Sequence, residues 1–326
     1  MKTRITEIFG IQYPIVQGGL AYLAYAELAS AVSNAGGLGQ ITAATLGTPE
    51  KLREEIRRVR TMTDKPFGVN FAIARHDGNY KDLLEVAIEE KVPAISITGG
   101  NPQPVFERLK GENIKTLVLV SGVRQAQKAE ELGADAIMAV GQEGGGHLGR
   151  EDIGTMVLIP RVVESVSIPV LASGGIGNGN GLLAAFALGA EGIEMGTRFI
   201  ATQECVHANN VYKKALVNAK ETDTVIIKKT LGTPGRVLRS EYTRDIIERE
   251  QHGATYEDLK NVVSGEANCR YIYDGNEQEG FGWAGQVAGL IKDIPTVQEL
   301  FDEMVSTAEQ GKQRLVNIFE AEKKFI

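Results

Sequence analysis

The chain has 326 residues, enough for one large domain or two ordinary ones, and its composition of 43% hydrophobic and 24% charged residues is that of a globular protein. A net charge of -7 disfavours nucleic acid as a partner, and no apolar run is long enough to span a bilayer. The two cysteines and four histidines lack disulfide or metal-ligand spacing, so we expect no metal site. Residues 1–7 have no apolar core like that of a signal peptide, which favours a cytoplasmic protein.

Short apolar runs alternate with amphipathic stretches through about residue 200. We predict strands at residues 13–19, 38–42, 66–71, 94–100, 115–120, 135–140, 169–175 and 192–199. The intervening stretches predict helices, and one of them begins at Thr48 with Pro49 in the first helical position. Continuous apolar strands separated by helices indicate a parallel sheet buried on both faces. Eight such units predict an α/β fold of the (β/α)8 TIM-barrel type.

The alternation stops after residue 199. Residues 205–280 carry more charge, including Lys228 and Lys229, and only residues 242–251 and 256–263 suggest helices. A second glycine-rich loop at residues 281–286 precedes a short helix and a final amphipathic helix at residues 296–319. We therefore predict a barrel over residues 1–204, a helical cap that contacts substrate over 205–280, and C-terminal helices over 281–326 that pack back on the barrel.

Glycine or a small polar residue ends most of the predicted strands. The positions are Gln17 to Gly19, Asn70, Gly99 and Gly100, Ser121 and Gly122, the loop 141–149, Gly174 and Gly175, and Gly196 and Thr197. In a barrel these strand ends share one rim, which is where active sites lie. Any single glycine pair is equally well explained as a short turn, so the prediction rests on their coincidence.

The ends of strands seven and eight predict a phosphate site. Gly174, Gly175 and Gly196 let the backbone approach an anion closely, and Thr197 adds a hydroxyl donor. The competing reading is a pair of plain turns. The spacing of Gly144, Gly146 and Gly149 has the form G-x-G-x-x-G, but no acidic residue ends the next strand, which argues against a dinucleotide fingerprint.

His147 lies within the glycine-rich loop that follows the sixth strand. A histidine beside a phosphate-anchored cofactor suggests proton transfer to or from a carbon-centred substrate. Two plainer readings remain: a histidine that only hydrogen-bonds to the cofactor, and a flexible turn. Trp283 and Phe281, in the second glycine-rich loop, either close over the site or pack against the C-terminal helix.

These motifs resemble those of the nitronate monooxygenase family, flavoenzymes built on a (β/α)8 barrel. The chain is also similar to the related NADH:quinone reductases and FMN-dependent enoyl-acyl-carrier-protein reductases. The resemblance runs essentially end to end and is carried by residues 13–19, 34–39, 66–70, 143–149, 169–175 and 195–199.

The resemblance implies FMN at the barrel mouth. Gln17, Gly18, Gly19 and Asn70 would meet the isoalloxazine, and Gly174, Gly175, Gly196 and Thr197 the phosphate, while Gln286 belongs to a segment that approaches the flavin. His147 matches the family's active-site histidine, placed to take the α-proton of a nitroalkane. The reaction implied is the oxidation of alkyl nitronates or nitroalkanes with O2.

Three positions depart from patterns within the family. Gly144 stands where many monooxygenases have alanine, and Val140 and Leu119 stand where quinone reductases tend to have aspartate and lysine. The alternative function is an NAD(P)H-dependent reductase of quinones or enoyl thioesters. A flavin-free barrel that binds a phosphorylated metabolite is the rival from another class. We expect a small-molecule substrate, and a homodimer if the chain associates.

Overall fold

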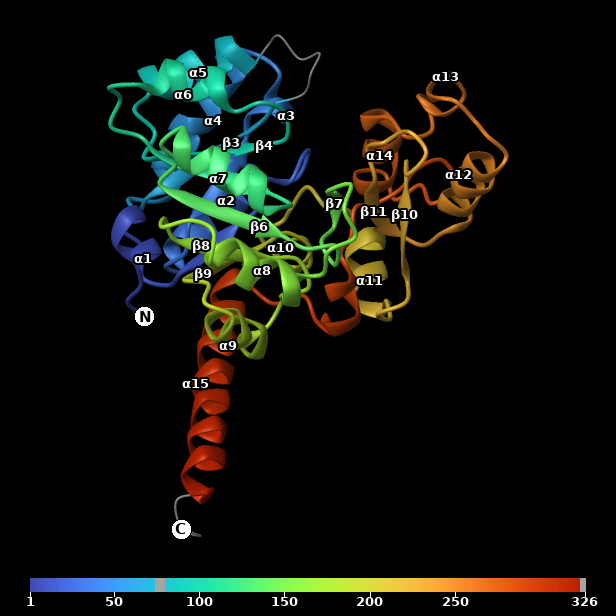
Figure 1. The fold of residues 1–326 in the computed structure, drawn as a ribbon. Helices are drawn as coiled ribbons and strands as arrows, with labels where there is room; N and C mark the ends of the chain where they lie inside the picture. Colours follow the sequence, from blue (N-terminus) through green and yellow to red (C-terminus); the bar gives the residue numbers. More distant parts are fainter. Residues whose placement is uncertain (74–79, 323–326) are drawn as a thin grey trace.

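The computed structural model describes residues 1–73 and 80–322, and its centre is a sheet of eight parallel strands (Figure 1). The strands are β1 Ile15–Gln17, β2 Gly39–Thr42, β3 Phe67–Ala72, β4 Ala94–Thr98, β5 Lys115–Val120, β6 Ala136–Val140, β8 Val170–Ser173 and β9 Gly192–Met195. Their spatial order is β1-β9-β8-β6-β5-β4-β3-β2. A parallel bridge between Val16 and Leu38 joins the two end strands, so the sheet closes into a barrel. The predicted barrel is confirmed.

Helices cover the outside of this barrel, one after most strands. They are α2 Ala26–Asn34, α3 Ala43–Leu46, α4 Pro49–Met62, α5 Tyr80–Glu89, α6 Gln103–Leu109, α7 Val123–Glu131, α8 Thr155–Val163 and α9 Gly179–Ala187. The start of α4 is as predicted, because the Thr48 hydroxyl accepts a hydrogen bond from the Lys51 amide and Pro49 occupies the first turn. The inner face of α4 buries Leu52, Ile56 and Val59 completely.

The amino-terminal end of the barrel is filled by apolar side chains. Helix α1, Arg4–Phe9, packs Ile5 and Phe9 into one cluster with Val16 and Leu38, which point into the barrel. A barrel closed in this way is a packed core rather than a channel. The space available for a ligand therefore lies at the opposite end, where the strands finish.

Strand eight is shorter than predicted. β9 stops at Met195, and Thr197–Ile200 forms the short helix α10, with Gly196 as the residue before it. Thr197 and Arg198 therefore do not alternate across a strand. The Arg198 guanidinium is buried and pairs with Asp293 at 3.1 Å, away from the barrel mouth.

The segment after the barrel forms a lobe beside it (Figure 1). Its helices are α11 Asn210–Asn218, α12 Glu241–Gln251, α13 Tyr256–Leu259 and α14 Gly265–Ile272. The lobe also contains an antiparallel hairpin that the sequence did not predict, made of β10 Thr224–Ile227 and β11 Gly235–Leu238. β11 pairs in turn with β7, Gly146–His147, in the loop after the sixth barrel strand. A separate apolar cluster includes Ile227 and Val237 of this hairpin together with Phe281.

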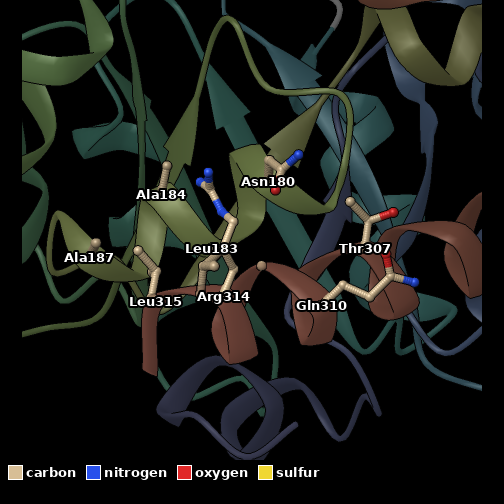
Figure 2. Close-up of a pocket in the computed structure, with 9 residues that line it drawn as sticks. Asn180, Leu183, Ala184, Ala187, Thr307, Gln310, Arg314 and Leu315 are labelled. Atoms are coloured by element: carbon tan, nitrogen blue, oxygen red, sulfur yellow. The ribbon is translucent and has the colours of Figure 1, made fainter. Parts of the chain in front are cut away.

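The chain ends in the 3-10 helix Gln286–Leu290 and the long helix α15, Val297–Glu322, which packs on α9 and then projects from the barrel (Figure 1). Close packing is possible because Gly179 has no side chain to collide with the Met304 carbonyl. A groove of about 490 Å³ lies between the two helices, lined by Asn180, Leu183, Ala184, Ala187, Thr307, Gln310, Gly311, Arg314 and Leu315. Figure 2 shows this groove in close-up. Over the described residues, no helix has the length and apolar character needed to cross a membrane.

Candidate active site

A cavity of about 260 Å³ opens at the carboxyl ends of the barrel strands, between the barrel and the lobe. It collects residues from most barrel strands, from the loop 141–149, and from α11, α14 and the second glycine-rich loop. Of the residues predicted for the site, it is lined by Gly19, Asn70, His147, Gly174, Gly175, Gly196 and Thr197. Gln17, Gly18 and Gln286 do not line it.

Two glycines at the end of β8 adopt backbone conformations that other residues rarely take. Gly174 has φ 88° and Gly175 has φ 76°, both in the left-handed region. A Cβ on Gly174 would lie 3.0 Å from the Gly141 carbonyl oxygen, and one on Gly175 would lie 3.2 Å from Glu143 Cβ. These glycines form, with Gly196 and Thr197, a cradle with its backbone open to the cavity. Such a cradle suits an anion, so the residues present fit a phosphate group.

The floor of the cavity holds a buried polar layer. Asn70 donates from Nδ2 to Ser96 Oγ at 2.9 Å, and a side chain on Gly19 would collide with the Asn70 amide. Gln17 donates from Nε2 to the carbonyl oxygens of Gly18 and Gln40, both at 2.9 Å. The amide nitrogen of Gln17 is thus used by the backbone of β1 and β2, and its role here is to brace the two strand ends.

Glu194 is an acidic side chain of the cavity that the sequence did not single out. It comes from β9, lines the cavity, and accepts a hydrogen bond from Ser173. Burial raises the pKa of the Glu194 carboxyl, and the Ser173 hydrogen bond opposes that shift. A Cβ on Gly18 would overlap the Glu194 carboxylate, so Gly18 is small because Glu194 occupies the space beside it.

The loop 141–149 is fastened at several points. The Glu143 carboxylate accepts hydrogen bonds from the amide and hydroxyl of Thr155, the first residue of α8. Arg236, from β11, donates to the Gln142 carbonyl oxygen from Nε at 3.1 Å and from a terminal nitrogen at 2.9 Å. Thr155 of the barrel and Arg236 of the lobe thus hold adjacent residues at the start of the loop, and β11 of the lobe pairs with Gly146 and His147 farther along it.

The second glycine-rich loop lies directly against the first. A Cβ on Gly145 would come within 2.5 Å of the Gly285 nitrogen. The two loops can therefore lie this close together only with glycine at both positions. The Gly285 amide donates to Thr197 Oγ1 at 2.9 Å, and the Gln286 amide donates to the Glu143 carbonyl oxygen at 2.9 Å. Gln286 contributes this backbone contact while its side chain is exposed. The Thr197 hydroxyl is therefore already engaged as an acceptor.

His147 is held by residues of the lobe. The residue is exposed and lines the cavity, and the centroid of its ring lies 4.9 Å from that of Trp283. Lys228 Nζ lies 2.8 Å from His147 Nε2. Desolvation by the cavity walls, and then the charge of Lys228, lower the pKa of His147 from 6.5 to about 4. The imidazole is consequently neutral at physiological pH.

Comparison with known proteins identifies the family. The family model described as Nitronate monooxygenase matches residues 2–82 and 78–307. A probable nitronate monooxygenase of Staphylococcus saprophyticus is 32% identical over 96% of this chain and 99% of its own. The chain belongs to the nitronate monooxygenase family. As a member of that family, it is an oxidoreductase.

The chain is also similar to two proteins with other names. The (3aS,4S,5R,7aS)-5-hydroxy-7a-methyl-1-oxo-octahydro-1H-indene-4-carboxyl-CoA dehydrogenase of Rhodococcus jostii is 31% identical over 94% of this chain and 96% of its own. The structure of FabK from Thermotoga maritima has a TM-score of 0.92 and 39% identity, covering 98% of this chain and 99% of its own.

The other histidines lie apart from the cavity of this nitronate monooxygenase family member. His207 Nε2 is 3.8 Å from Glu27, and His252 contacts the Glu248 carbonyl oxygen. His76 falls outside the described residues. Across residues 1–73 and 80–322, no three His, Cys, Asp or Glu side chains gather closely enough to hold a metal ion.

Some residues at the cavity could be predicted from the sequence, and others could not. Trp283 lines the cavity, as one of its two readings predicted, and Phe281 packs edge-on behind it with centroids 5.1 Å apart. Arg236 and Lys228 were not predicted, because both act on the loop 141–149 from a hairpin that has no clear sequence signal. The consecutive lysines at 228 and 229 give the impression of a charged surface turn, but Lys228 is buried.

Proposed function

We propose that this protein is an FMN-dependent oxidoreductase that oxidises alkyl nitronates with O2. The observation that carries the proposal is the cavity itself, in which a glycine cradle and a neutral histidine face one space in a chain of the nitronate monooxygenase family. Bound FMN would supply the redox chemistry, taking electrons from the substrate and passing them to oxygen.

The cofactor would be held by residues that already have the required character. The open backbone of Gly174, Gly175 and Gly196, beside Thr197, would bind the phosphate as an anion. Asn70 presents its amide at the cavity floor. Apolar side chains that line the walls would exclude water from the flavin ring; they are Leu119, Met138, Val140, Ile176, Ile200, Ile272 and Val287.

His147 and Trp283 would form the substrate side of the cavity. Trp283 offers an apolar face beside the imidazole, suited to the alkyl part of a nitronate. The neutral ring of His147 can donate one hydrogen bond to a nitro oxygen. A nitronate is already deprotonated, so its oxidation needs no base, whereas a neutral nitroalkane first has to lose its α-proton.

A second candidate function is NAD(P)H-dependent reduction of a quinone or an enoyl thioester. It is favoured by the similarity to the Rhodococcus jostii dehydrogenase, whose name specifies a CoA thioester substrate. The same cavity would serve, with the thioester carbonyl oxygen in place of the nitro oxygen. The two functions differ in the compound that reduces the flavin.

The deciding experiment uses the purified protein under anaerobic conditions. Released cofactor is first identified by absorbance and mass, and FMN is expected. The protein is then mixed with an alkyl nitronate, NADH or NADPH in separate reactions, and flavin bleaching is followed by stopped flow. Bleaching by the nitronate alone supports the monooxygenase. Rapid bleaching by NADH or NADPH, with none by the nitronate, overturns it in favour of the reductase.

A flavin-free function is tested in the same preparation. Protein that contains no flavin and gains none after incubation with FMN would contradict both candidate functions. The protein would then fit the flavin-free alternative, a barrel whose glycine cradle binds another phosphorylated compound.

A further inference from the structure

Lys228 is a buried cation that meets the cavity histidine from behind. It directly follows β10 and has φ 60°, a left-handed conformation that is uncommon for a lysine. Its side chain is 7% exposed, and it is not among the residues that line the cavity. Its contact with His147 Nε2, at 2.8 Å, is therefore made from the side of the ring turned to the lobe.

Several elements converge to hold this lysine. The Lys228 amide donates to the Glu250 carboxylate of α12 at 2.9 Å, and Glu250 also accepts from the Thr230 amide at 3.1 Å and hydroxyl at 2.8 Å. Lys228 Nζ lies 5.1 Å from the centroid of the Trp283 ring, a cation–π distance. A contact built from β7, β10, α12 and the second glycine-rich loop is part of the lobe's framework rather than a surface encounter.

The charges around the pair decide which atom donates. Burial lowers the pKa of Lys228 from 10.5 to about 8, and the negative charge of Glu250 opposes that shift. The pKa of His147 is lowered to about 4 by desolvation and by Lys228. Between these values the lysine is an ammonium, which can only donate, and the imidazole is neutral. Nε2 must then be the acceptor, and the ring carries its proton on Nδ1.

We infer that Lys228 is a positioning residue that fixes His147 as a neutral hydrogen-bond donor, so that the site binds the oxygen end of a substrate and does not remove a proton from carbon. The inference rests on the proposed function for the identity of that substrate. It narrows the substrate to one that arrives with an electron-rich oxygen, such as a nitronate anion, in preference to a neutral nitroalkane. Donation from Nδ1 to such an oxygen leaves the proton count of the pair unchanged.

The first test reads the histidine directly and needs neither substrate nor cofactor. Nitrogen-15 NMR of the full chain, labelled at its four histidines, reports the tautomer of each ring, and His147→Asn identifies the His147 signals. We expect a neutral ring with its proton on Nδ1 in the wild type between pH 6 and 7. Lys228→Met keeps the apolar stem but should abolish the tautomer preference and return the titration of His147 toward its ordinary range. Lys229→Met, at the exposed neighbouring position, should change nothing.

The second test is kinetic. With a nitronate, Lys228→Met should lower the second-order rate constant of anaerobic flavin reduction roughly ten- to hundredfold. This is the range expected for a lost charge-assisted hydrogen bond. In the wild type this rate should fall as pH rises through about 8, where Lys228 loses its proton. Lys228→Arg cannot lose its charge in that range, so it should keep the tautomer and move the fall to higher pH.

Each outcome bears on one claim. An unchanged His147 tautomer in a folded Lys228→Met variant would overturn the inference, as would wild-type reduction of the flavin by neutral nitroalkane as fast as by nitronate. If Lys228→Met does not fold, the tautomer and pH profile of Lys228→Arg decide the matter. A changed tautomer in a protein that no nitronate reduces would leave the role of Lys228 standing and refute the proposed function alone.

Discussion

Replacement of Gly18 by alanine tests the geometry of the cavity floor. The added methyl group would overlap the Glu194 carboxylate and lie 3.0 Å from Glu194 Cδ, while its nearest other neighbour, the Met195 carbonyl oxygen, is at 3.4 Å. The conflict is therefore with one side chain only. Glu194 has to swing away, and its hydrogen bond from Ser173 is lost in a buried setting.

The cost follows from that lost bond. Leaving a buried polar partner unsatisfied costs about 1–3 kcal/mol, and the free energy of unfolding of Gly18→Ala should fall by that amount. Each kcal/mol corresponds to a fall in Tm of roughly 2–4 °C for a chain somewhat smaller than this one. The measurement is thermal and urea unfolding of the apoprotein, because bound cofactor would add its own stabilisation. Gly68→Ala is the control, since its methyl group meets no atom closer than 3.4 Å.

A double variant distinguishes this explanation from a general intolerance of β1. Glu194→Ala removes the obstructing carboxylate, so adding Gly18→Ala in that background should cost less than about 0.5 kcal/mol. The two changes are then strongly coupled. If Gly18→Ala destabilised both backgrounds equally, the proposed collision with Glu194 would be refuted.

Three further predictions concern the rest of the site. Gly175→Asp should abolish FMN retention, because it places a side chain and a negative charge in the phosphate cradle. Gly133→Asp is the control: it is also at positive φ, but an added Cβ there meets no atom within 4 Å, so this variant should retain FMN. Equal flavin content in the two variants would contradict the proposed cradle. The pKa of His147 is about 4 in the folded protein and 6.5 in the unfolded chain, so the unfolded chain binds more protons between these pH values. The stability of the apoprotein should therefore fall as the pH drops from 6.5 to 4. His147→Asn should flatten that part of a plot of Tm against pH. Arg236→Met removes both hydrogen bonds to the Gln142 carbonyl and should speed hydrogen exchange in residues 141–149 with flavin retained; unchanged exchange would mean that other contacts hold the loop.

The barrel was predictable because each of its strands is a local pattern. The apolar run at residues 136–140 predicted a strand over 135–140, and the strand observed is Ala136–Val140. Asp135 lies just before the strand, and its carboxylate accepts hydrogen bonds from the Lys115 side chain and the Thr116 amide. The glycine pair Gly174 and Gly175 at a strand end was predictable too, because a backbone with positive φ strongly favours glycine.

The lobe was not predictable in the same way. β10 and β11 have four residues each, and the strand that completes their sheet, Gly146–His147, is half glycine, which disfavours strands. Lys228 owes its role to a histidine 81 positions away, and Glu194 owes its role to Ser173 and to the space at Gly18. These contacts join residues that are far apart in the sequence, so a local sequence pattern does not predict them.

The residues of the cavity come from two parts of the chain, the barrel and the lobe, which the pairing of β7 with β11 joins. The glycine cradle belongs to the barrel, whereas His147 is oriented by Lys228 and Trp283 from the lobe. Substitutions within residues 224–283 can therefore change the surroundings of His147 without replacing any residue of the glycine cradle. Engineering of the surroundings of His147 in this chain should therefore begin with the hairpin of β10 and β11.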